Sequence, residues 1–323
     1  MVLQALVIGL GKIGMEYDFN LSNKNIMTHC RALTMHPDFQ LLGAVDLNTE
    51  KLKNFKLKYN LPVGKNIDTL AKQIKNPDLV VLATPTESHL ETLEMVFEKF
   101  SPNIVLCEKP ISYDIKEAKK IIRICDREGA KLYINYIRRS EPAVKKLYSM
   151  MQDNKLGKYW HGVVFYSKGF LHSASHFHNM FLLLLGPMRI SRQISLIKRL
   201  PENDFIISAE ITYQRGIIQF IPIPGDHYDH YCFDIFSEKS RVSYDYGGKQ
   251  VTVNSSKENN WLGNHENSFD KIQTVPNDFN RFQLHVLDDL KNAFSGKETF
   301  LFSGTEDLKS LIDIRKLFNE KKN

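Results

Sequence analysis

Short apolar runs alternate with longer stretches of helical periodicity through the first 135 residues of the chain. The apolar runs predict strands at residues 3–8, 41–45, 79–83, 104–107 and 131–134, with a shorter strand near Val63. Helices are predicted between them, over residues 28–35, 49–59, 68–74, 87–100 and 114–128. Regular alternation of strands and helices is typical of a doubly wound parallel sheet with right-handed crossovers.

The pattern changes near residue 136. Beyond it, β-like runs follow one another with few helices between them, including residues 163–166, 205–207, 217–220 and 231–236. Gly216 and Gly247-Gly248 stand where hairpin turns belong, and helices over 279–293 and 305–320 close the chain. We therefore expect an α/β dinucleotide-type domain over 1–136. An α+β domain with a large, mostly antiparallel open sheet should occupy 137–323.

Composition narrows the classes of protein to consider. A chain of 323 residues exceeds what one hydrophobic core normally serves, which agrees with two domains. The net charge of +6 comes from scattered lysines, which argues against a nucleic-acid partner. No run reaches the roughly 18 apolar residues of a membrane span, and the N-terminus lacks the basic flank and cleavage site of a signal peptide. The four cysteines show no paired or metal-type spacing, so we expect free thiols and a cytoplasmic protein.

A glycine pattern follows the first predicted strand. It reads Gly9-Leu10-Gly11-Lys12-Ile13-Gly14, and in this position the glycines allow a tight turn, close approach of a pyrophosphate and contact between helix and strand. The phosphates would meet the backbone N–H groups around Lys12 and Ile13 at a helix N-terminus. The pattern predicts a Rossmann-type dinucleotide site.

Asp46 ends the next predicted strand, where a carboxylate can accept hydrogen bonds from the adenosine ribose. It would repel a 2′-phosphate, and Leu47-Asn48 lack the arginine that receives one, so we expect NAD and regard NADP as less favoured. The alternative is that Asp46 only caps a helix. The interval from Gly14 to Asp46 is longer than usual; residues 16–25 predict an insertion in the first helix or a loop over the cofactor.

Lys109 follows the buried run at 104–107 within Glu108-Lys109-Pro110. Ligands of an open parallel sheet bind beyond the carboxyl ends of its strands, so an amine placed there can reach a bound substrate. The alternative is a solvated lysine in a turn, because X-Pro sequences often begin turns. A proton-transfer role is the sharper hypothesis.

With these residues assembled, the chain resembles the Gfo/Idh/MocA oxidoreductase family. The resemblance runs through Gly9-x-Gly11-x-x-Gly14, Asp46, Ala83-Thr84-Pro85 with His89, Glu108-Lys109-Pro110, Arg138-Arg139 with Pro142, and His176-Phe177-His178-Asn179 to Gly186. Beyond Gly186 only the general strand pattern is similar.

The resemblance implies roles for the matching residues. Thr84 and Pro85 are similar to the loop beside the nicotinamide ribose, with His89 close behind, and Glu108 resembles the residue that helps to hold the nicotinamide end. Lys109 resembles the catalytic lysine, preceding a proline bond that is often cis in this family. His176 resembles the catalytic histidine of the second domain.

One position departs from the family pattern. Many sugar and inositol dehydrogenases of this family carry Asp four residues before the catalytic histidine, where this chain has His172. If the segment is helical, His172 and His176 share one face. His172, His176 and His178 can also be read as metal ligands, but we expect no metal, because the resemblance already explains His176.

Further residues concern the substrate. Lys168-Gly169 before His176 resembles family members from surface-polysaccharide pathways, whose substrates are often nucleotide sugars. Lys168 would then pair with a phosphate or carboxylate, unless it is simply solvated at a strand end. Tyr136, Arg139 and His172 are further candidates for substrate contacts.

We therefore expect an NAD-dependent oxidoreductase that transfers a hydride to or from a secondary alcohol or ketone carbon of a sugar, sugar acid or nucleotide sugar. Lys109 and His176 would transfer the proton. Two alternatives stay open: a catalytically silent NAD- and sugar-sensing protein of the same fold, and an NAD-assisted lyase or hydrolase that returns the hydride. An open sheet leaves one face to cover, so a homodimer or homotetramer through the C-terminal sheet is expected.

Overall fold

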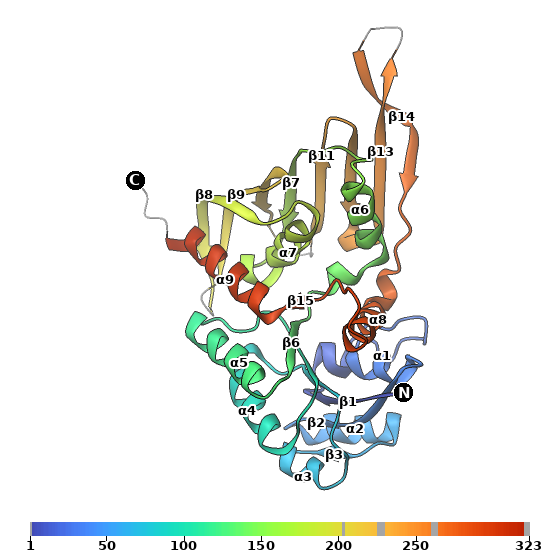
Figure 1. The fold of residues 1–323 in the computed structure, drawn as a ribbon, viewed down its shortest axis with the longest axis vertical. Helices are drawn as coiled ribbons and strands as arrows, with labels where there is room; N and C mark the ends of the chain where they lie inside the picture. Colours follow the sequence, from blue (N-terminus) through green and yellow to red (C-terminus); the bar gives the residue numbers. More distant parts are fainter. Residues whose placement is uncertain (1, 202–203, 225–229, 260–263, 320–323) are drawn as a thin grey trace. The chain divides into compact units, whose positions relative to one another are not determined.

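The computed structural model describes residues 2–201, 204–224, 230–259 and 264–319. The chain divides into two compact units, the first formed by residues 1–140 with 280–309 and the second by residues 141–279 with 310–323. The first unit therefore ends four residues after the predicted boundary at residue 136. It also includes residues 280–309, which the prediction assigns to the second domain. That segment carries α8 (Phe282–Phe294), which lies beside α1 (His29–Met35) in Figure 1.

The first unit is built on a seven-stranded sheet of order β15-β6-β5-β4-β1-β2-β3. Every pairing is parallel except that of β15 with β6. The order reverses between β1 and β4, which is where a doubly wound sheet opens a crevice for a ligand. The predicted fold class is confirmed. The bounds are β1 Leu3–Ile8, β2 Phe39–Val45, β3 Val63–Gly64, β4 Leu79–Leu82, β5 Ile104–Cys107, β6 Lys131–Ile134 and β15 Phe302–Ser303.

The helices of this unit begin at side-chain caps that the sequence supplies. Thr28, Asn48, Asn66 and Asp114 each accept hydrogen bonds from backbone N–H groups of the first turn that follows. The helices so begun are α1, α2 (Thr49–Tyr59), α3 (Ile67–Ala71) and α5 (Ile115–Arg127). The unit also contains α4 (His89–Lys99). Strands β1, β4 and β5 are buried on both faces, as a sheet covered by helices requires.

The expected insertion interrupts the first helix. A short π-helix, Lys12–Glu16, is followed by turns, and α1 begins only at His29. The turns close around a buried ion pair, in which Asp18 accepts from the N–H groups of Met27 and Thr28 while the Arg31 guanidinium donates to several loop carbonyls. Lys58 of α2 lies over the Phe19 ring, so the loop packs against α2.

The second unit is built on an eight-stranded sheet of order β14-β13-β12-β11-β7-β10-β9-β8. It is antiparallel apart from the β10–β7 pair, as the sequence predicted. Strands β8, β12, β13 and β14 were not predicted. The bounds are β7 Trp160–Tyr166, β8 Met188–Arg199, β9 Phe205–Tyr213, β10 Gly216–Pro222, β11 Tyr231–Phe236, β12 Ser240–Asp245, β13 Gln250–Asn259 and β14 Asn264–Thr274.

One face of this sheet is covered by helices. Phe177 and Phe181 of α7 (Ser175–Leu184) pack on Phe220 and Phe233 of the sheet, and α6 (Pro142–Gln152) lies beside α7 (Figure 1). Helix α9 (Gly304–Asn319) begins in the first unit and ends in the second. Among the described residues, no helix is long and apolar enough to cross a membrane.

Candidate functional site

The glycine turn after β1 has the geometry that the fingerprint requires. Gly9 has a φ of +99°, and a Cβ there would overlap the Ala83 carbonyl. A Cβ at Gly14 would overlap the carbonyl of Gly9, which brings the π-helix onto the strand. Gly11 instead faces open space, with the Lys51 Nζ as the nearest atom, 3.8 Å from where a Cβ would stand. The turn therefore leaves room above Gly11 for another molecule.

Asp46 is tied to this turn and does not cap the next helix. Its Oδ2 accepts from the Leu10 N–H at 2.6 Å, and its Oδ1 accepts from the Asn48 N–H at 2.7 Å. The cap of α2 is Asn48, whose side chain accepts from the N–H groups of Glu50 and Lys51. The helix-cap alternative for Asp46 is therefore excluded, and the partly exposed carboxylate keeps lone pairs for a ligand.

A cavity of about 430 Å³ opens at the carboxyl ends of β1, β2, β3 and β4. Four of the residues predicted to bind a cofactor line it: Gly9, Asp46, Thr84 and Pro85. The Thr84 hydroxyl is buried without a hydrogen-bond partner in the described part of the chain, so it suits a polar ligand group. The cavity also brings in residues that the sequence did not single out, namely Leu47, Lys65, Asn66, Ile67, Ser88, Glu91, Thr92 and Met95.

His89 supports the Thr84 loop from behind. Its fully buried ring places Nε2 3.1 Å from the Thr84 carbonyl oxygen and Nδ1 3.1 Å from that of Ile111. Burial lowers the pKa of His89, so the ring is neutral and donates one hydrogen bond. The Cys107 thiol lies 3.3 Å from Nδ1, and burial raises its pKa, so it stays protonated and can donate to that nitrogen. The neutral ring therefore donates to one of the two carbonyl oxygens.

Glu108 lies at the end of β5, on the neighbouring strand, and its carboxylate has two buried partners. His29 Nε2 lies 2.7 Å from Oε1, and the Asn135 amide donates to the same oxygen at 2.6 Å. Burial by itself raises the pKa of Glu108, but the hydrogen bonds from His29 and Asn135 and the nearby charge of Lys109 outweigh it, and the pKa is lowered. Glu108 is therefore an ionised, oriented carboxylate.

Lys109 follows Glu108 directly and is half-buried, and the Lys109–Pro110 peptide bond is cis. Two other candidates of this unit serve its structure. Arg139 is 8% exposed and donates from Nε to the Phe300 carbonyl at 2.9 Å. Tyr136 is 7% exposed, with its ring packed edge-on against Phe302. Both residues thus hold the returning C-terminal segment, a placement that favours a structural role over substrate contact.

Three histidines of the second unit, His172, His176 and His178, lie on one helical stretch. His172 lies in a π-helix, Phe170–Ala174, that runs directly into α7, so the residues between His172 and His176 are helical and do not form a turn. His172 is exposed and His176 half-buried. His178 is fully buried, and its Nδ1 lies 2.8 Å from the Tyr213 hydroxyl. Within the described residues, no three His, Cys, Asp or Glu side chains gather as a metal ion would require.

Asp204 holds the start of this helical stretch. Its carboxylate accepts from the N–H groups of Leu171 and His172 at 2.8 and 2.9 Å, and a Cβ at Gly169 would overlap it. Lys168, just before Gly169, is exposed and has a φ of +67°, which is uncommon outside glycine. Lys168 and Lys198 line a cavity of about 520 Å³.

Several of these residues were not predicted from the sequence. His29, Asn135 and Asp204 belong to no local motif, because each meets its partner across a long interval of chain. The only available signal was polar residues in otherwise apolar surroundings, such as Asn135 directly after a buried strand.

Comparison with known proteins places the first unit. Residues 3–136 match the family GFO_IDH_MocA, described as an oxidoreductase family with an NAD-binding Rossmann fold. Over these residues the chain is similar to the Gfo/Idh/MocA oxidoreductase family. The resemblance drawn from its motifs is confirmed.

Individual curated relatives match this chain over less than half of its length. It is 33% identical over 159 residues to inositol 2-dehydrogenase from Mycolicibacterium smegmatis, covering 48% of this chain and 42% of that protein. It is 32% identical over 81 residues to D-xylose 1-dehydrogenase [NADP(+)] from Haloarcula marismortui, covering 25% and 22%. The matched part thus spans less than half the length of these curated relatives.

Likeness of fold extends further. The dehydrogenase WlbA from Bordetella pertussis, solved in complex with NADH and UDP-GlcNAcA, is similar over 99% of this chain and 98% of its own, with a TM-score of 0.73. At 17% sequence identity this likeness concerns the fold of both units.

Proposed function

We propose that this protein is an NAD-dependent oxidoreductase acting on a secondary alcohol or ketone carbon of a sugar, sugar acid or nucleotide sugar. The observation that carries the proposal is the cavity at the reversal of strand order. There Asp46, bound to the glycine turn, and Thr84, whose hydroxyl is buried, both line a cavity at the place where a dinucleotide would bind. Lys109 follows at the end of β5, which pairs with β4.

The residues of the cavity fit NAD. Gly11 leaves space for a pyrophosphate beside the N–H groups of Lys12 and Ile13, and Asp46 offers lone pairs to the adenosine ribose. Leu47, next to Asp46, is 87% exposed and offers no charge to a 2′-phosphate. These features support NAD over NADP, although one matched relative is named for NADP. When bound, the nicotinamide supplies hydride exchange with a carbon atom.

The protein must then transfer a proton at the substrate oxygen. The charge of Lys109 helps to keep the neighbouring Glu108 carboxylate ionised. An amine held beside this carboxylate can donate a proton or stabilise negative charge developing on oxygen. His176 is the complementary acid–base group from the second unit, and Asp204 fixes the helical stretch that carries it. His172, on the same stretch, replaces the aspartate of many relatives.

The substrate class is inferred from the relatives and from one surface. Inositol and xylose dehydrogenases are among the matched relatives, and WlbA binds a nucleotide sugar acid. Lys168 and Lys198 beside the 520 Å³ cavity would suit an anionic substituent such as a phosphate or carboxylate. A nucleotide sugar is therefore the first candidate, which agrees with a role in polysaccharide biosynthesis.

The test combines a substrate panel with one variant and a matched control. Wild-type protein is assayed for absorbance change with NAD or NADH and myo-inositol, D-xylose, and the UDP derivatives of N-acetylglucosamine and of its uronic acid. On the active substrate, Lys109→Ala should lower kcat by at least about a hundredfold while NADH binding stays within about threefold. Lys131→Ala, on an exposed lysine of β6, should leave both unchanged. Tight NADH binding without turnover of any substrate would favour the sensing alternative, and normal turnover by Lys109→Ala would refute the assigned role.

We also propose that the second unit forms a homodimer or homotetramer through its open sheet. The face opposite α6 and α7 carries half-exposed apolar side chains, including Phe165, Ile217 and Ile221, and Ile190 on β8 is 66% exposed. Contiguous apolar surface of this kind is usually covered by a partner. Light scattering after gel filtration should give two or four times the chain mass; a monomer at micromolar concentration would refute the proposal.

A further inference from the structure

Hydrogen bonds from several elements hold the turn that carries Lys109. The Glu108 N–H donates to the Leu82 carbonyl at 2.9 Å, and Pro110 has no N–H to offer. The next donor is the Ile111 N–H, which bonds to the Oδ2 of Asp307 at 3.3 Å. Asp307 lies 196 residues further along the chain. The turn is thus held by a carboxylate from the C-terminal segment at the Ile111 N–H, and His89 of α4 lies 3.1 Å from the Ile111 carbonyl oxygen.

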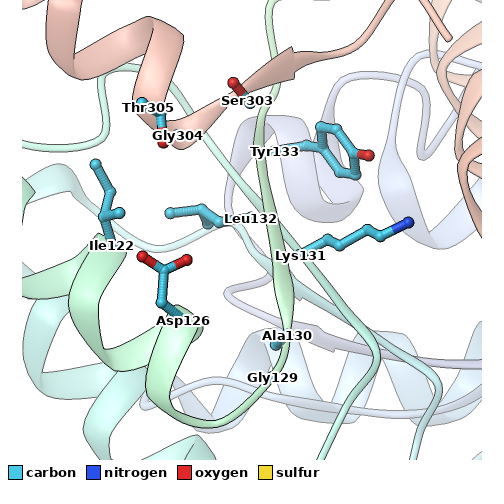
Figure 2. A pocket seen from close by; sticks show the side chains of 10 residues that line it. All are labelled: Ile122, Asp126, Gly129, Ala130, Lys131, Leu132, Tyr133, Ser303, Gly304 and Thr305. Atoms are coloured by element: carbon cyan, nitrogen blue, oxygen red, sulfur yellow. The ribbon is translucent and has the colours of Figure 1, made fainter.

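Asp307 is itself held firmly by the structure around it. Strand β15 pairs with β6, matching Phe302 to Ile134, and Ser303 forms a reciprocal cap with Glu306 at the start of α9. Figure 2 shows Gly304 and Ser303 at this start, near Leu132 of β6, and a Cβ at Gly304 would come within 2.6 Å of the Leu132 side chain. The first turn of α9 therefore lies close against the edge of the sheet.

Burial of the Asp307 carboxyl group disfavours its ionised form. The residue is 2% exposed, and its only described neutral donors are the Ile111 N–H and the Tyr136 hydroxyl. Burial raises the pKa of Asp307 to about 6, and the charge of Glu306 raises it further. Of the remaining titratable groups near it, the Cys107 thiol is kept protonated. A buried carboxylate that is ionised and has two neutral donors lowers the free energy of unfolding at neutral pH. We therefore expect Asp307 to serve the position of the Ile111 N–H that it binds.

We propose that Asp307 is a positioning residue that fixes the turn at Lys109–Pro110–Ile111 by accepting the Ile111 N–H. This inference rests on the proposed role of Lys109 in proton transfer. The chemistry needs the Lys109 amine within hydrogen-bond reach of a reacting oxygen, and a displacement of about 1 Å costs on the order of a hundredfold in rate. Tyr136 contributes by holding the other side of the same carboxyl group.

Two substitutions separate positioning from mere support of the fold. Asp307→Ala removes the acceptor, whereas Asp307→Asn keeps an oxygen for the Ile111 N–H and removes the charge. Asp126→Asn, on the wall of the neighbouring pocket in Figure 2, is the matched control. We expect Asp307→Ala to speed hydrogen exchange of the peptide containing Ile111 by about tenfold or more, the scale of one lost hydrogen bond. Asp307→Asn should exchange at nearly the wild-type rate, and Asp126→Asn at the wild-type rate.

The second readout is the reactivity of Lys109 itself, measured by trace labelling with acetic anhydride and peptide mass spectrometry. Labelling of Lys109 should change at least about threefold in Asp307→Ala and be restored toward wild type in Asp307→Asn. With a substrate found in the panel, kcat of Asp307→Ala should fall at least about tenfold at nearly constant KM. Asp307→Asn should also unfold at higher urea than wild type at pH 8, because it removes the buried charge.

Unchanged Lys109 labelling in Asp307→Ala would overturn the proposal, even if exchange at Ile111 becomes faster, because the turn would then be positioned without Asp307. If Asp307→Ala does not fold, labelling of Lys109 is expressed relative to that of the exposed Lys131 at pH 5 and at pH 7.5, so that the ordinary titration of amines cancels. A ratio that changes with pH in wild type and stays constant in Asp307→Asn supports the proposal, and equal pH dependence in the two proteins refutes it. If no substrate is turned over, the proposed function fails, while the exchange and labelling results still decide the role of Asp307.

Discussion

Replacing Asp46 tests its proposed role in binding the cofactor, in addition to the hydrogen bonds by which it holds the glycine turn. Its carboxylate accepts from the Leu10 N–H at 2.6 Å and from the Asn48 N–H at 2.7 Å. In Asp46→Ser the turn loses its anionic acceptor, and the ribose loses a charged hydrogen bond. A hydrogen bond to a charged group contributes about 1.5–3 kcal/mol, so NADH affinity should fall about 10- to 150-fold.

Affinity for NADPH should change in the opposite direction. Serine removes a negative charge from the place where a 2′-phosphate would lie, so NADPH should bind as well as in wild type or better. The preference for NADH over NADPH should therefore drop by about a hundredfold, combining the loss in NADH affinity with the relief of repulsion. Asp46→Asn keeps an oxygen for Leu10 and removes only the charge, so its loss of NADH affinity should be smaller than that of Asp46→Ser.

The assay is titration of NADH and NADPH by fluorescence at fixed ionic strength, because screening alters the repulsive part. Asp68→Ser, at an exposed aspartate of the same unit that pairs with Lys99, is the control and should bind both cofactors as wild type does. A wild-type preference for NADPH, or wild-type NADH affinity in Asp46→Ser, would refute the reasoning from the Asp46 contacts.

Two further predictions concern stability, both read from urea unfolding. Arg31→Met leaves the Asp18 carboxylate buried without its ion-pair partner and should cost about 3–5 kcal/mol, whereas Lys155→Met in an exposed pair should cost under about 1 kcal/mol; equal losses would contradict the argument. Burial lowers the pKa of His178 to about 4, so the folded state resists protonating it, and stability is full above pH 6.5 and declines as the pH falls toward 4. His178→Phe also loses the contact with Tyr213. It should lower the slope of the free energy of unfolding against pH, between pH 6.5 and 4, by about 1.4 kcal/mol per pH unit, the value for one proton. An unchanged slope would show that other groups cause the decline.

Much of the first unit followed from local signals. The glycine pattern was enough to predict the turn after β1. Only glycine readily adopts the positive φ found at Gly9, and at Gly14 any Cβ would overlap the Gly9 carbonyl. The insertion was visible as a polar stretch poor in helix formers, and Thr28 marked the resumption of the helix. The insertion is tied to α1 by the ion pair of Arg31 with Asp18 and to α2 by Lys58, which lies over the Phe19 ring.

The second unit was harder to predict because its strands depend on their neighbours. Strand β8 is mostly exposed and lacks the strict alternation that reveals a half-buried strand, so only its pairing with β9 defines it. Helix α7 is apolar on most sides, which hides its period, and it was expected from family resemblance alone.

The sequence by itself determined the order of strands and helices over residues 1–136, the glycine turn with Asp46, and the positions of Lys109 and His176 in the chain. Each of these depends on residues close together in sequence, where period and residue type are legible. Only the tertiary structure decided what supports them. Glu108 meets His29 across 79 residues, and Ile111 meets Asp307 across 196. Such contacts leave no local pattern, because a hydrogen bond depends on distance in space and the folded sheet alone brings these partners together.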